Sequence, residues 1–81
     1  MVTLTLQDMQ FMKAALRAPY PVTIEDIKEA GRLLGVQPMW RGFDTQWEAE
    51  QYATMCEDRM GRKALIFEGT ETPQFWVACK G

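Results

Sequence analysis

The sequence predicts an α+β domain in which three helices pack on a small antiparallel β-sheet. Three segments place apolar residues at helical spacing after a threonine that can cap a helix. Two later segments have the apolar pattern of strands, and a short loop containing glycine joins them. The expected order is helix, helix, possible strand, helix and β-hairpin, within a single domain over residues 1–81. We expect all three helices to cover one face of the sheet.

The first helix is expected to begin after Thr5, because Asp8 can complete a capping box from the third helical position. Pro19 and Pro21 should end this helix, since proline lacks an amide donor and restricts the residue before it. The apolar arc that should face the core consists of Met9, Phe11, Met12, Ala15 and Leu16.

The second helix should begin at Thr23, which is a favourable N-cap. Glu25 and Asp26 then lie in the first turn, where acidic side chains suit the helix dipole. Gly35 is well placed to end this helix, because glycine readily adopts the left-handed conformation needed there. The apolar face consists of Ile24, Ile27, Ala30, Gly31 and Leu34.

The segment Val36–Phe43 fits either a short edge strand or an ordered loop packed on the core. Pro38 cannot donate to a sheet ladder, which argues against a central strand. Met39, Trp40 and Phe43, however, are too apolar for a fully solvated loop.

The third helix should open with Asp44 or Thr45 as its cap, and Thr45 can form a capping box with Glu48. Gly61 should end it. Between these limits a narrow stripe of residues has the spacing of a buried helix face. The stripe consists of Ala49, Tyr52, Ala53, Cys56 and Met60.

The last part of the chain is expected to form a β-hairpin with strands at residues 62–68 and 74–79. The first of these strands is apolar on both faces and should therefore be central, through Ala64, Leu65, Ile66 and Phe67. In the second strand, Phe75 and Val77 should face the core, and Trp76 should point the other way.

Composition sets limits on function. The net charge of −2 lacks the basic footprint of most nucleic-acid-binding proteins. Cys56 and Cys79 have no metal-ligand spacing, and the chain contains no histidine, so we expect reduced thiols, no metal site and no cofactor. We find no signal peptide and no apolar run of about 20 residues, and we therefore expect a soluble protein of the cytoplasm without a membrane partner.

Nothing in the sequence names a reaction. Histidine and serine are both absent, which removes the most common general base and a common nucleophile. Glu57 and Asp58 are neighbours on a helix and point in different directions, unlike a glycosidase pair across a cleft. Cys56 lies on the predicted core stripe without a histidine partner. We therefore expect a binding module and not an enzyme.

The third helix carries an unusual charge distribution. Between Asp44 and Gly61, five acidic residues oppose only Arg59. Carboxylates repel DNA phosphates, so this helix should meet a basic protein surface and not DNA. The predicted partner-binding residues are Trp47, Glu48, Glu50, Gln51, Thr54, Glu57 and Asp58. An outward tryptophan beside acidic residues would suit an interface anchor.

Three alternatives to this interpretation stay open. The acidic face can be simply solvated, which is routine for an amphipathic helix. Trp47 can fold back onto Trp40 or Phe43 instead of facing solvent. A third class of function is a subunit or adaptor of a larger assembly, with Met39, Trp40 or Trp76 exposed for docking.

The order of elements resembles a winged helix. Residues 23–36, which begin TIEDI and end LGV, look like the first helix of a helix-turn-helix and the start of its turn. Residues 52–61, followed by LIF at 65–67, look like a recognition helix that runs into a wing, and residues 62–79 would be that wing. This resemblance implies a small DNA-binding regulator as the alternative function.

Two features depart from the winged-helix pattern. The connection over residues 36–44 is longer than the roughly three or four residues of the usual turn. No arginine or lysine lies at the centre of the outer face of the third helix, although Arg41, Arg62 and Lys63 could touch a DNA backbone from its flanks.

In size, element order and acidic face (Glu48, Glu50, Glu57 and Asp58), the chain is similar to the small phage-encoded anti-CRISPR inhibitor proteins. The resemblance implies a non-catalytic protein that binds a CRISPR effector and blocks its engagement of target DNA in the host cytoplasm. The expected partner is a basic surface of a nucleic-acid-binding protein. The chain itself would be a monomer or a weak homodimer.

Overall fold

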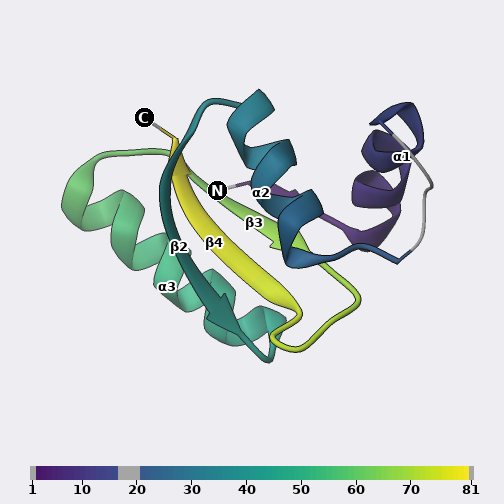
Figure 1. The fold of residues 1–81 in the computed structure, drawn as a ribbon. Helices are drawn as coiled ribbons and strands as arrows, with labels where there is room; N and C mark the ends of the chain where they lie inside the picture. Colours follow the sequence, from purple (N-terminus) through teal and green to yellow (C-terminus); the bar gives the residue numbers. More distant parts are fainter. Residues whose placement is uncertain (1, 17–20, 81) are drawn as a thin grey trace.

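A four-stranded mixed β-sheet with helices on both faces forms the centre of the molecule (Figure 1). The computed structural model describes residues 2–16 and 21–80, apart from the side chains of residues 13–16 and 37–39. The elements are β1 Val2–Leu4, α1 Leu6–Leu16, α2 Ile24–Leu33, β2 Val36–Phe43, α3 Gln46–Met60, β3 Ala64–Glu68 and β4 Phe75–Lys80. The predicted α+β class, with three helices on a small sheet, is confirmed.

The strands lie in the order β1-β3-β4-β2. β1 pairs parallel with β3, while β4 is antiparallel to both β3 and β2. The hairpin therefore supplies the two central strands, as predicted for β3, and β2 is an edge strand, which is one of the two possibilities that the sequence left open for residues 36–43. The sheet is mixed and not purely antiparallel because β1, which the sequence did not predict, adds a parallel edge.

The two faces of the sheet are covered by different helices, which corrects the expectation that all three share one face. β1, β2 and β3 run in the same direction. The chain crosses from one edge of the sheet to the other through α1 and α2, and α3 then brings it back to β3 (Figure 1). Connections between parallel strands are almost always right-handed, so crossings in opposite directions use opposite faces.

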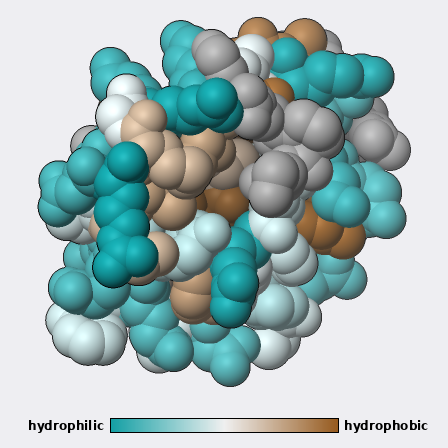
Figure 2. Space-filling model, turned by 90° about the vertical axis from the view of Figure 1, so that its left-hand side faces the viewer, coloured by the Kyte–Doolittle hydropathy of each residue, from teal (hydrophilic) through white to brown (hydrophobic). Residues whose placement is uncertain are grey.

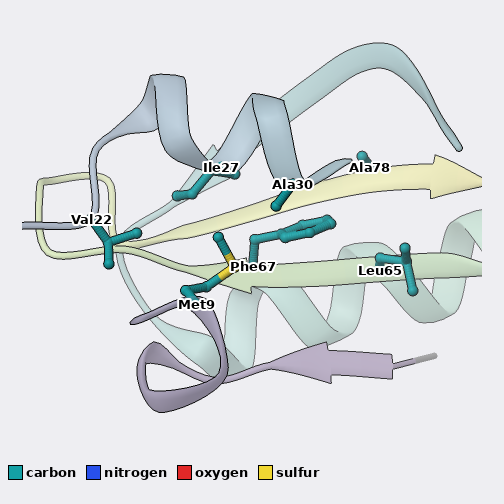
Figure 3. Close-up of a cluster of buried hydrophobic side chains, with 7 residues drawn as sticks. All are labelled: Met9, Val22, Ile27, Ala30, Leu65, Phe67 and Ala78. Carbon is teal, nitrogen blue, oxygen red and sulfur yellow. The ribbon is translucent and has the colours of Figure 1, made fainter. Parts of the chain in front are cut away.

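The core on the α1 and α2 face is built around Phe67 (Figure 3). The ring of Trp40 meets the ring of Phe67 edge-on, with 5.1 Å between the ring centres. The buried members of this cluster are Met9, Val22, Ile27, Ala30, Leu65, Phe67 and Ala78. Phe11 does not join them and is 83% exposed, because α1 packs through Leu6, Met9 and Met12 on its other side.

The core on the α3 face uses small helical residues. Ala49 and Ala53 are fully buried and let α3 lie close to the sheet, where they meet Ile66 and Val77. Cys56 continues this buried stripe as predicted. Met60 does not: it is the last residue of α3 and is 53% exposed.

The predicted helix starts are confirmed at Thr5, Thr23 and Thr45. Asp26 accepts a hydrogen bond from the backbone N–H of Thr23 at 2.9 Å, which completes the capping box of α2. In α3 the hydroxyl of Thr45 accepts from the N–H of Glu48 at 3.2 Å, so Thr45 and not Asp44 is the cap. Pro19, expected to help end the first helix, lies outside the described residues.

Candidate partner-binding surface

The outward side of α3 presents one continuous row of exposed residues. Because Ala49, Ala53 and Cys56 are buried against the sheet, the residues on the opposite side of the helix must face solvent. This row, here named the α3 ridge, consists of Trp47, Gln51, Thr54 and Asp58. Its members are separated by four, three and four residues, which places them on one line along the helix.

Trp47 faces solvent, with 68% of its surface exposed. The two aromatic residues onto which it could have folded have other partners. Trp40 packs on Phe67 on the other face of the sheet. Phe43 packs on Tyr52, with 5.3 Å between the ring centres. The indole of Trp47 is therefore available for contact with another molecule.

Glu48 and Glu50 flank the α3 ridge with negative charge, and Asp58 adds a carboxylate within the ridge itself. Glu48 is exposed, and its carboxylate accepts a hydrogen bond from the hydroxyl of Thr45 at 3.0 Å. Glu50 accepts from the side-chain amide of Gln46 at 3.1 Å. These local contacts hold the carboxylates in place without neutralising them, because none of the donors is charged.

Glu57 differs from the other predicted site residues. Like Glu50 it is half-buried, but its carboxylate accepts a hydrogen bond from the backbone N–H of Ala64 at 3.0 Å. This backbone hydrogen bond lowers the pKa of Glu57 from its ordinary value. Glu57 therefore ties α3 to β3 and lies apart from the α3 ridge.

Met55 is an exposed apolar residue that the sequence interpretation left out. It follows Gln51 by four residues and Trp47 by eight, so it lies beside the α3 ridge one and two turns further along. This helical spacing is the sequence signal that could have placed Met55 beside the exposed face of α3. Viewed from the side of the molecule on which α3 lies, hydrophilic residues cover much of the surface, with several hydrophobic areas between them (Figure 2).

The tryptophans considered for an adaptor function are both partly buried. Trp40 packs against the core cluster around Phe67. Trp76 also packs on this cluster, and its indole N–H donates to the carbonyl of Pro73 at 2.9 Å. The side chain of Met39 lies outside the described residues. Of the three tryptophans, Trp47 is the exposed one.

The winged-helix comparison does not hold for the arrangement of the helices. In a helix-turn-helix, a short turn lets the two helices pack together. Here β2 separates α2 from α3, and the two helices lie on opposite faces of the sheet. The hairpin also differs from a wing, because β3 and β4 are the two central strands.

Both cysteines lie at least partly in the interior of the fold. Cys56 is buried and Cys79 is partly buried, and both thiols are free. Burial and the neighbouring thiol of Cys56 raise the pKa of Cys79, which disfavours the nucleophilic thiolate. Within residues 2–16 and 21–80, no group of three or more Cys, Asp or Glu side chains is placed to hold a metal ion.

Comparisons with protein-family models, curated proteins and solved structures returned no match for this chain. Among the described helices, none combines the length and the apolar character needed to cross a membrane.

Proposed function

We propose that this chain is a non-catalytic inhibitor of the anti-CRISPR type, which binds a CRISPR effector and blocks its engagement of target DNA. The observation that carries the proposal is Trp47, an indole 68% exposed on a helix face whose flanking charges are carboxylates. Large exposed aromatic residues supply much of the binding energy at protein interfaces. The site of action would be the cytoplasm of the host cell.

The negative charges beside Trp47 would be complementary to a positively charged surface on the partner protein. DNA-binding channels are lined with lysine and arginine, and carboxylates can occupy the positions that phosphates otherwise take. Glu48 and Asp58 are ten residues apart, so they lie about 15 Å apart along the helix axis. That length corresponds to roughly four phosphates of one DNA strand.

Rigidity of α3 favours binding through this face. The helix is capped at Thr45 and Gly61, and its buried alanines fix it to the sheet. Little conformational entropy would therefore be lost from the backbone on association. The arrangement supports a preformed surface and not a segment that folds on binding.

The proposal is tested with purified effector–guide complexes and labelled target DNA in a gel-shift assay. Addition of this chain should prevent the effector from shifting the DNA, while the chain alone should not shift random duplex DNA. Tight, salt-dependent binding of the chain to random DNA would instead support the DNA-binding regulator. Failure to inhibit any effector type would contradict the proposal.

Trp47→Ala tests whether Trp47 contributes to binding of the effector. Loss of an interface anchor typically costs about 2 kcal/mol or more, so the variant should bind the effector at least about thirtyfold more weakly. Phe11→Ala is the matched control, because Phe11 is an exposed aromatic residue on α1, on the other face of the sheet. Equal binding by both variants would remove Trp47 from the interface.

A further inference from the structure

A pocket of about 240 Å³ lies beside α3, between the helix and the paired strands β2 and β4. Val77 and Ala78 on β4 line it, as do Tyr52 and Met60 on α3. The register between β2 and β4 shifts between Val36 and Trp40, next to this pocket. Such irregularities re-aim side chains and often accompany binding sites.

Two arginines give the pocket a positive charge. Arg41 on β2 and Arg62 after α3 both line it, and its lining contains no acidic residue. Neither guanidinium forms an ion pair within the part of the chain that the structure describes. This local charge stands out in a chain whose net charge is −2. Unpaired guanidinium groups beside one pocket favour an anionic occupant.

The position of Arg41 is fixed by an aromatic contact. Its guanidinium carbon lies 5.6 Å from the centre of the Tyr52 ring, within the range of a cation–π interaction. Tyr52 also packs on Phe43. Because a cation–π contact uses the face of the guanidinium, the N–H groups of Arg41 stay available to a carboxylate or phosphate.

We infer that this pocket binds a small organic anion, whose charged group meets Arg41 and Arg62 and whose apolar body lies on Tyr52, Met60 and Val77. The volume is below the roughly 300–1,000 Å³ of pockets for drug-sized ligands, so a single ring with one acidic group is a suitable size. This site is separate from the α3 ridge and does not depend on the proposed inhibitor function.

The test is a titration of the ¹⁵N-labelled full chain, followed by two-dimensional NMR. Benzoate and phenyl phosphate are the probes, benzyl alcohol is the neutral analogue, and inorganic phosphate is the anion without an apolar body. Both organic anions should cause saturable shifts at the amides of Arg41, Arg62 and Ala78. Benzyl alcohol and inorganic phosphate should bind at least about tenfold more weakly, since each lacks one of the two contacts.

Variants assign the effect to the two arginines. Arg41→Gln and Arg62→Gln should each weaken benzoate binding about tenfold, as expected for loss of a charge-assisted hydrogen bond, with the fold retained in the NMR spectrum. Lys63→Gln removes the same charge next to Arg62 without touching the pocket lining and should leave the affinity unchanged. The inference is overturned if no probe gives saturable shifts, if benzyl alcohol or phosphate binds as tightly as benzoate, or if Lys63→Gln has the same effect.

Discussion

The carboxylate of Glu57 accepts a hydrogen bond from the backbone N–H of Ala64 at 3.0 Å. Ala64 is fully buried, so this contact satisfies a backbone donor where β3 begins. Glu57, one of the five acidic residues between Asp44 and Gly61, therefore stabilises the fold. Substitutions on α3 can therefore test the structural role of Glu57 separately from the binding role proposed for the other acidic residues.

Glu57→Ala should destabilise the fold, because the N–H of Ala64 would lose its acceptor. An unsatisfied buried donor costs about 1–3 kcal/mol, which should appear in urea unfolding. Glu50→Ala, on the same side of α3 but bonded among the described residues only to Gln46, should change the free energy of unfolding by less than about 0.5 kcal/mol. Equal losses from the two substitutions would contradict the role given to Glu57.

The stabilisation from Glu57 should also depend on pH. The hydrogen bond from Ala64 lowers the folded-state pKa of Glu57 below its ordinary value of 4.5. Its contribution is therefore present above about pH 4.5 and is lost as pH falls through the lowered pKa. The difference in unfolding free energy between the wild type and Glu57→Gln should shrink from about pH 7 to about pH 3. A constant difference would show that the charge of Glu57 is not involved.

Gly31→Ala should destabilise the chain, although alanine normally stabilises a helix by about 1 kcal/mol relative to glycine. A Cβ at Gly31 would lie 2.4 Å from Cζ2 of Trp40, and Val36 also blocks the space. Such overpacking typically costs about 1–3 kcal/mol in unfolding experiments. Lys28→Ala, at an exposed position of α2, serves as the control and should be close to neutral. A more stable Gly31→Ala variant would contradict the close approach of α2 to β2.

Cys79 should alkylate slowly in the folded chain. Burial and the thiol of Cys56 raise the pKa of Cys79 above its ordinary value of 9.0, so little thiolate forms near neutral pH. Mass spectrometry after iodoacetamide treatment should show slower modification at Cys79 than in the urea-unfolded chain. Equal rates in both states would mean that Cys79 is not protected by the fold.

Local patterns in the sequence were sufficient to predict the three helices and the β-hairpin. The caps at Thr23 and Thr45 and the stripe of Ala49 and Ala53 depend on residues within a few positions of one another, and all are found in the structure. The outward position of Trp47 was one of two possibilities that this stripe left open, and the structure decides for it.

The features that the sequence did not predict depend on contacts between distant residues. β1 has only three residues, too few to show an alternating pattern, and it pairs with β3, more than 60 residues away. Without β1, the first crossover and the opposite placement of α3 could not be inferred. The pocket of Arg41 and Arg62 has the same origin, because β2 and the end of α3 approach each other only in the folded chain.

Charge reversal on α3 tests the central claim most directly. Glu50→Lys combined with Asp58→Lys should abolish the ability of the chain to block DNA binding by its effector, with a melting temperature close to that of the wild type. Glu25→Lys combined with Glu71→Lys makes the same change in charge away from α3 and should inhibit like the wild type. If the α3 double variant still blocks the effector at wild-type concentrations, the acidic face is solvated surface and the proposed mechanism is wrong.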